Sequence, residues 1–371
     1  MRLIHALLSL ALGACAVPAA AQVYVSPVQL IDGNGDGKIK LTSARGPYKR
    51  GWTIVFCPKA APFTYVRGVA CPAVTPPPPP PEPEPEPDVE PTPAPAQVKT
   101  GVNATGELFL EGRRLGIGIN SRGALGTLKD APEGFTTDLP TGLKRVGLFP
   151  LWGGLHDALL QGRAIEGFHI GYRTGGKTFV HSNAPLTGYN EIAGTQSAAL
   201  SNVGGVASWT GDTAEALRVE QRITLAADAE HVRVDVVLTN RGTATLSDLR
   251  YMRSFDPDQS DLYATANRIE RQGGGEALVT AGLPKSTSSF FLHARDPRAV
   301  ASFYGFVNTD PYAALAHATP QPAGTARFVD QTLNLTFALG VLAPGASTSL
   351  TLYMGVTADL PATLATIGGE R

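Results

Sequence analysis

Apolar and polar side chains alternate with a period of two over most of the chain after residue 98. The clearest alternations lie at residues 232–238, 333–339 and 350–352. Successive side chains of a β-strand point to opposite faces, so this period indicates strands with one buried face. Each of these segments is therefore predicted to be a half-buried strand.

Turn-forming residues separate the predicted strands. Residues 239–243 (TNRGT) and 343–346 (APGA) are typical of hairpin connections, and no stretch has the pattern and caps of a long helix. Residues 112–120 (GRRLGIGIN) predict an early strand whose glycines mark bulges or close backbone approaches. The sequence from 98 to 371 thus predicts an all-β fold, a large antiparallel β-sandwich in one domain.

A segment rich in proline and glutamate, residues 75–97, precedes this domain. Proline fixes φ and lacks an N–H donor, so such a run is extended and joins neither a helix nor a sheet. About twenty residues of this kind would span roughly 60 Å. We predict a stiff linker between two folded parts, a small β module at 22–74 and the sandwich at 98–371.

The first residues are typical of an export signal. Arg2 is followed by an apolar run at 3–17 and by small residues at 18–21, which predicts a secretory signal peptide over residues 1–21. Residues 12–15 (LGAC) also resemble the lipobox of bacterial lipoproteins, in which Cys15 becomes the lipidated N-terminus. Both alternatives predict an exported protein, secreted, periplasmic or at the cell surface, and only the second attaches it to a membrane.

The small module contains two further cysteines, Cys57 and Cys71, each followed by proline. Two thiols close together in an oxidising compartment predict one disulfide, which closes a loop of about 15 residues and contributes about 3 kcal/mol in the chain-entropy model. The alternative is a pair of free buried thiols. The prolines favour loops, and with them the disulfide.

The same module contains a stretch that matches the first half of a calcium-binding loop. Asp32, Asn34 and Asp36 place oxygen ligands at positions 1, 3 and 5, and a glycine follows at position 6. The second half departs from the pattern, because Lys40 and Ser43 occupy positions 9 and 12. Asn-Gly and Asp-Gly pairs are also favoured hairpin turns, so the alternatives are a weak calcium site and a glycine-rich turn.

Charge and motifs exclude several classes of function. The formal net charge is −1 and no basic stripe is present, which argues against a nucleic-acid partner. The sandwich has no cysteine, and the chain has no G-x-S-x-G elbow, P-loop, dinucleotide fingerprint or H-E-x-x-H pair. No established type of catalytic site follows from the sequence.

Residues 251–261 (YMRSFDPDQSD) are the strongest site candidate. The strand places Arg253 near its end, and a proline then stops it, so that Asp256, Asp258 and Asp261 project from a turn. Three carboxylates near an arginine could hold calcium, orient a sugar hydroxyl or form a buried ion pair. The alternative is ordinary Asp-Pro-Asp turn chemistry.

A second candidate is the run at 149–157 (FPLWGGLHD). Trp152 beside two glycines, followed by His156, predicts an aromatic surface for a sugar with a polar group at its rim. Tryptophan is also a common core residue, which is the other interpretation of this run.

Residues 236–259 resemble a β module that recurs in large secreted and surface proteins of Gram-negative bacteria. Residues 165–172, and 330–335 with 342–345, fit the same module. The resemblance covers most of the chain after the linker and implies no settled activity. More loosely, the strand that ends at Thr239-Asn240 is similar to strands of the galactose-mutarotase-like supersandwich, which occurs in enzymes and accessory domains that act on sugars.

Three hypotheses about function remain. The first is a noncatalytic binding or adhesion protein of the bacterial envelope, which presents the sandwich to a glycan or to a surface protein. The second is a carbohydrate-active enzyme that uses an aspartate such as Asp256 and a histidine such as His156 as acid and base. The third is a structural subunit of a surface assembly that pairs through exposed strand edges.

Overall fold

The computed structural model describes residues 97–370 except 203 and 260–262, together with the backbone of four short strands nearer the N-terminus. The chain divides into two compact units, Met1–Glu90 and Pro91–Arg371. The four short strands form one antiparallel sheet in the order β1-β4-β3-β2. Their bounds are Val23–Val25 (β1), Lys38–Lys40 (β2), Thr53–Phe56 (β3) and Thr64–Arg67 (β4). The predicted calcium ligands Asp32, Asn34 and Asp36, the disulfide, the signal peptide and linker residues 75–96 lie outside the described residues.

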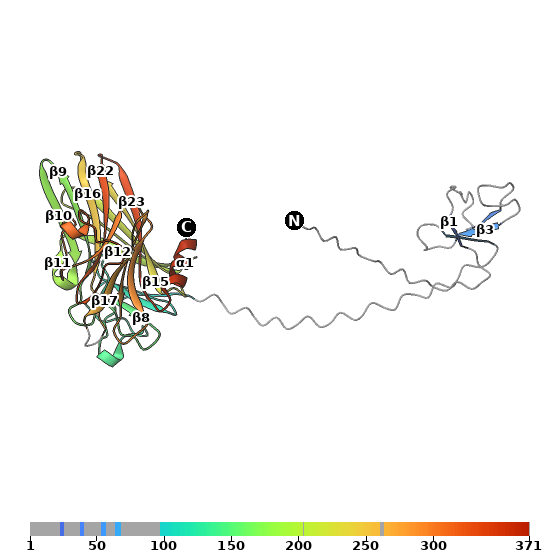
Figure 1. Ribbon diagram of the computed structural model, residues 1–371, viewed down its shortest axis with the longest axis horizontal. Helices are drawn as coiled ribbons and strands as arrows, with labels where there is room; N and C mark the ends of the chain where they lie inside the picture. Colours follow the sequence, from blue (N-terminus) through green and yellow to red (C-terminus); the bar gives the residue numbers. More distant parts are fainter. Residues whose placement is uncertain are drawn as a thin grey trace. The chain divides into compact units, whose positions relative to one another are not determined.

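The second unit is built on a six-stranded and a nine-stranded sheet, both antiparallel (Figure 1). The order in the first is β11 (Tyr189–Asn190), β10 (Lys177–Ala184), β9 (Glu166–Thr174), β16 (Leu246–Phe255), β22 (Leu333–Leu342) and β20 (Ala299–Phe303). The order in the second is β12 (Gly194–Ser201), β13 (Gly204–Asp212), β14 (Leu217–Leu225), β15 (His231–Asn240), β23 (Ser347–Thr357), β19 (Ser289–Ala294), β18 (Glu276–Gly282), β17 (Thr265–Gly273) and β21 (Ala326–Val329). The predicted large antiparallel sandwich is confirmed.

Aromatic side chains join the two sheets across the core. Phe255 of the six-stranded sheet stacks on Phe290 of the nine-stranded sheet with ring centroids 4.0 Å apart, and Phe168 meets Trp209 edge-on at 5.5 Å. The predicted alternation holds on β15, whose even-numbered positions 232–238 are fully buried between the sheets. Burial of this apolar face is the main stabilising contribution to such a sandwich.

A third antiparallel sheet covers part of the same core. Its strands are β5 (Lys99–Val102), β6 (Leu108–Glu111), β7 (Leu115–Ile119) and β8 (Leu148–Pro150). β7 is the predicted early strand and begins at Leu115, and Gly118 within it approaches the backbone of Val146 so closely that a Cβ would collide with the carbonyl oxygen. The predicted role of a glycine as a point of close approach is confirmed there.

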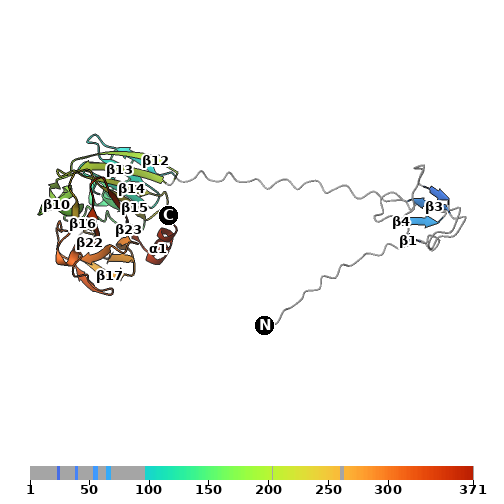
Figure 2. The same ribbon diagram turned by 90° about the horizontal axis from the view of Figure 1, so that it is seen from above.

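The outer faces of both large sheets are partly covered. The single α-helix in the described part of the chain, α1 (Leu360–Gly369), packs Ile367 against Leu278, Phe291 and Tyr353 of the nine-stranded sheet (Figure 2). Three 3₁₀ turns complete the elements: η1 (Leu139–Thr141), η2 (Pro185–Thr187) and η3 (Ala314–Ala316). None of the described helices is long and apolar enough to cross a membrane.

The segment after β20 covers the six-stranded sheet. Ser254 of β16 donates a hydrogen bond to the backbone oxygen of Asn308 at 3.3 Å, and the Asn308 amide donates to Asn334 of β22 at 3.2 Å. Strands β16 and β22 are therefore buried on both faces where the end of β16 pairs with the start of β22.

Candidate functional site

The turn after β16 is fixed to the loop that precedes β9. The backbone N–H of Asp256 donates to the carbonyl of Ile165 at 2.9 Å, and that of Asp258 donates to Ala158 at 3.0 Å. Gln259 closes the connection with two hydrogen bonds to the backbone of His156, at 3.1 and 3.0 Å. The first sequence candidate, residues 149–157, and the described part of the second, residues 251–259, thus lie side by side.

The structure gathers three carboxylates at this point, Asp256, Asp258 and Asp330. One oxygen from each lies within 4.8 Å of the others. Asp256 is 1% exposed and Asp258 is 2% exposed, while Asp330 on the chain between β21 and β22 is more accessible. We call these three residues the aspartate cluster.

Each member of the aspartate cluster has a buried oxygen without a hydrogen-bond partner: Oδ2 of Asp256, Oδ1 of Asp258 and Oδ1 of Asp330. No ion pair within the described residues involves any of the three. Buried carboxylate oxygens are normally paired, because an unpaired one costs free energy. The cluster therefore offers carboxylate oxygens without hydrogen-bond partners, as is expected of residues that bind a cation.

Burial and mutual repulsion change the acidity of the cluster. The pKa of Asp256 is raised to about 8, first because burial disfavours the charged form and then because Asp330 repels it. The pKa of Asp258 is also raised to about 8, by burial and then by the charges of Asp256 and Asp330. Burial also raises the pKa of Asp330. Without a bound cation, protons partly neutralise the cluster at neutral pH.

Arg253 is not part of this cluster. Its side chain is 0% exposed and points into the core, where it pairs with Glu166 and donates to the Gln221 side chain at 3.0 Å. The pKa of Glu166 is raised because burial outweighs the opposing charge of Arg253. Asp261, the third predicted carboxylate, lies outside the described residues.

A cavity of 480 Å³ lies beside the aspartate cluster. Its lining residues come from the loop of Trp152, Gly153, Gly154, Leu155 and His156, from the segment 284–288 (PKSTS) and from Gln259. The predicted Trp152 and His156 therefore meet in one cavity, which we call the Trp152 cavity. Neither Asp256 nor Asp258 is among its described lining residues.

Residues that do not line the cavity contact the side chains of Trp152 and His156. The guanidinium of Arg114 lies 5.0 Å from the centre of the Trp152 ring, and the ring nitrogen of Trp152 is buried without a hydrogen-bond partner. Nδ1 of His156 lies 3.1 Å from a carboxylate oxygen of the buried Asp138. Cation–π contact and hydrogen bonding thus fix both rings before any ligand arrives.

Asp330, Gln259 and the hydroxyl segment at 286–288 were not predicted as site residues. Asp330 joins Asp256 only because β22 pairs with β16, with Leu333 opposite Phe255. That pairing connects positions more than seventy residues apart in the sequence and is not a local signal. The only sequence signal at 286–288 is a run of small polar residues, which is also typical of a turn; in the structure this run connects β18 to β19.

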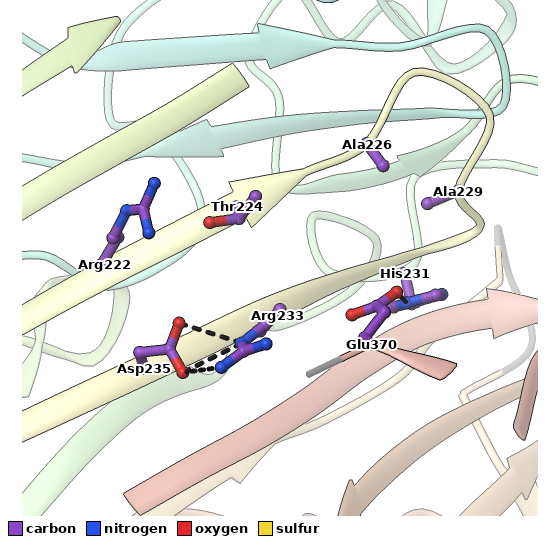
Figure 3. A pocket seen from close by; sticks show the side chains of 8 residues that line it. All are labelled: Arg222, Thr224, Ala226, Ala229, His231, Arg233, Asp235 and Glu370. Carbon is purple, nitrogen blue, oxygen red and sulfur yellow. Dashed lines mark hydrogen bonds and ion pairs between the residues drawn. The ribbon is translucent and has the colours of Figure 1, made fainter. Parts of the chain in front are cut away.

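A second cavity, of 330 Å³, lies on the outer face of β14 and β15 (Figure 3). Its charged groups largely satisfy one another: Arg233 donates to both oxygens of Asp235 at 3.0 Å, and His231 lies 2.9 Å from Glu370. Arg222 also lines it, and its side chain forms no hydrogen bond or ion pair with the part of the chain that the structure describes. The balanced charges make this cavity the weaker ligand-site candidate.

Gly162 supports the aspartate cluster from one side. A Cβ built on it would lie 2.6 Å from Oδ2 of Asp258 and 2.8 Å from the ring of Tyr263, and its φ is +58°. We expect Gly162→Ala to destabilise the protein by about 2 kcal/mol, from backbone strain and crowding together. The control is Gly175→Ala, with a similar φ of +56° and no atom near its Cβ. Urea unfolding in which both variants lose equal stability would contradict the crowding at Asp258.

Comparisons with known proteins find only distant structural similarities. No protein-family model matches the chain, and no curated protein matches it. A bacterial glucoamylase is similar over 75% of this chain and 35% of its own, with 10% identity and a TM-score of 0.40. A polysaccharide lyase is similar over 72% and 33%, with 13% identity and a TM-score of 0.35. The 4-alpha-glucanotransferase of Thermococcus litoralis is similar over 71% and 40%, with 12% identity and a TM-score of 0.36.

The chain spans well under half the length of each of these structures. At these identities and TM-scores, the likeness assigns no activity. The resemblance of residues 236–259 to a Gram-negative surface module remains a prediction.

Proposed function

We propose that this is an exported, noncatalytic binding protein whose β-sandwich recognises a carbohydrate in the Trp152 cavity. The proposal depends on one observation: two loops whose side chains suit carbohydrate binding line the same cavity. The 152–156 loop contributes an aromatic ring and an imidazole, and the 284–288 segment contributes hydroxyl groups and a lysine. Carbohydrate sites combine an apolar ring with several hydrogen-bonding groups in this way.

The cavity supports binding better than hydrolysis. Glycosidases usually place two carboxyl groups on either side of the bond they cleave. No aspartate or glutamate is among the described residues that line the Trp152 cavity. Among the described residues that line it, the ionisable side chains are those of His156 and Lys285. A sugar in this cavity would contact side chains that can bind it, but no pair of carboxyl groups that could act as acid and base.

The second candidate function is a carbohydrate-active enzyme, and one observation favours it. The pKa of Asp256 is raised to about 8 by burial and by Asp330, and a carboxyl group that keeps its proton at neutral pH can act as a general acid. Against it stands the 1% exposure of Asp256, which separates that carboxyl from solvent and from the cavity. A catalytic role would require the turn to open.

Binding of the purified full-length protein to a glycan array tests the proposal. For a glycan that binds, Thr287→Trp places a large ring in the cavity from an exposed position, and we expect at least about a tenfold loss of affinity. The control is Thr195→Trp, at an exposed site on β12, which should bind as the unchanged protein does.

Two results would contradict this function. Equal loss in both variants, or no glycan bound at all, would remove the Trp152 cavity as a carbohydrate site. Release of reducing sugar from the bound glycan, abolished by Asp256→Asn, would establish the enzyme in its place.

A further inference from the structure

We propose that Asp256, Asp258 and Asp330 bind one hard divalent cation of the calcium or magnesium type. The site is separate from the Trp152 cavity, and the inference does not depend on carbohydrate binding. It also lies in the other compact unit from the loop of Asp32, Asn34 and Asp36.

The first argument is geometric. Three carboxylates from two chain segments place one oxygen each within 4.8 Å of the others. Oxygens that share a cation of this type, at 2.0–2.6 Å from it, are separated by about 3–5 Å. The cluster therefore already has ligand spacing, without a change of rotamer.

The second argument is independent of the spacing, and it is the lack of partners. Asp256 and Asp258 are almost fully buried, and each has an inner oxygen that accepts no hydrogen bond from the protein. The corresponding oxygen of Asp330 is also buried and unpaired. Three carboxylates in one cluster that each have an unpaired buried oxygen are unusual in a folded domain, where nearly all buried polar atoms are paired. A cation bound by the cluster would give these carboxylates the partner that the protein does not supply.

The third argument is the kind of cation. The cluster offers carboxylate oxygen only, and no histidine or cysteine joins it among the described residues. Hard oxygen ligands select calcium, magnesium or manganese over softer metals such as zinc and copper. The formal charge of three carboxylates also requires at least a divalent ion for near neutrality.

The framework explains what the cation would do. Backbone hydrogen bonds fix the Asp256 and Asp258 ends of the site to residues 158 and 165, and the pairing of β16 with β22 fixes the Asp330 end. A shared ion would tie the turn after β16 to the connection between β21 and β22. The same turn carries Gln259, which lines the Trp152 cavity, so the cation would also hold one wall of that cavity.

The test uses the full-length protein, stripped of metal with EDTA and then freed of chelator. Calorimetric titration at pH 7.5 is made with CaCl2, MgCl2 and MnCl2 in separate runs, and the melting temperature is measured with and without each salt. We expect at least one of the three ions to bind and to raise the melting temperature of the sandwich by several degrees.

Variants assign the binding to this cluster. Asp256→Asn and Asp258→Asn should each weaken one equivalent of binding at least about a hundredfold and abolish its thermal shift. The double change Asp32→Asn and Asp36→Asn should leave that equivalent intact, as should the surface control Asp228→Asn. Both cluster variants should melt no lower than the metal-free parent, which shows that they fold.

The proposal fails in either of two cases. One is that none of the three salts binds or shifts the melting temperature. The other is that binding survives in Asp256→Asn and Asp258→Asn and is lost in the Asp32 and Asp36 variant. Neither result bears on carbohydrate binding, which the glycan array tests with Thr287→Trp.

Discussion

Replacement of Arg253 by methionine is expected to destabilise the sandwich by about 3–5 kcal/mol. Arg253 and Glu166 are both fully buried and form an ion pair, and Arg253 also donates to Gln221. Without the guanidinium, the Glu166 carboxylate has no opposite charge and must either stay ionised in the core or take up a proton. Both cost free energy, since no water replaces the lost guanidinium beside the buried carboxylate.

The matched experiment removes both charges. In Arg253→Met with Glu166→Gln, the uncompensated carboxylate is absent, so the double variant should be more stable than Arg253→Met alone. Urea unfolding, followed by the fluorescence of the buried Trp209, gives the free energy of unfolding for each variant. If Arg253→Met were as stable as the parent, the ion pair would contribute nothing. If the double variant lost as much free energy of unfolding as Arg253→Met and Glu166→Gln lose when measured separately and added, the two charges would not be coupled.

Arg253 also shows where local sequence patterns stop being informative. The alternation along β16 correctly places Tyr251, Arg253 and Phe255 on one face. It does not say which face meets the other sheet, because the Asn308 segment buries the opposite face as well. From the sequence, Arg253 and the three aspartates that follow it were predicted to form one polar site. Because both faces of the strand are buried, the alternation gave no sign that Arg253 points into the core. The actual partner, Glu166, is on β9, more than eighty residues earlier.

The strands themselves were predictable because each depends on its own residues. β15 and β22 have clean alternation with β-branched or large apolar side chains, and both are long strands of the sandwich. The helix α1 is different: Asp359 caps it by accepting from the N–H of Ala362, with Pro361 in its first turn. These local signals were present, but the helix has only ten residues.

The candidate site was predictable in part for the same reason. Trp152 and His156 lie within five residues of each other and line one cavity, while Asp256 and Asp258 lie in one turn. Tertiary contacts bring these residues together. Gln259 forms two hydrogen bonds with the backbone of His156, and the pairing of β16 with β22 brings Asp330 to Asp256. Neither contact has a signature in the linear sequence.

The stability of the metal-free protein is expected to fall as pH rises from about 4 to about 8. The pKa of Asp256 is raised to about 8 in the folded protein, by burial and by the charge of Asp330, from an ordinary value of 3.8. A raised folded-state pKa means that the folded protein holds this proton more tightly than the unfolded chain does. The resulting stabilisation is complete below the unfolded pKa and is lost as pH rises through the folded one.

Asp256→Asn isolates this effect, because its amide has nearly the shape of the protonated carboxyl and does not ionise. In EDTA, the variant should gain about 4 kcal/mol of stability relative to the parent between pH 5 and pH 8.5, since roughly three pH units of the titration of Asp256 fall in this window at about 1.4 kcal/mol each. Titrating groups outside the aspartate cluster cancel in the difference between the two proteins, which urea unfolding at several pH values measures. Asp258 adds to the difference, because its pKa is raised partly by the charge of Asp256. A difference that does not change between pH 5 and 8.5 would mean that Asp256 ionises normally in the folded state. Addition of the cation that the aspartate cluster binds should reverse the order at pH 8.5, since only the parent retains all three carboxylates.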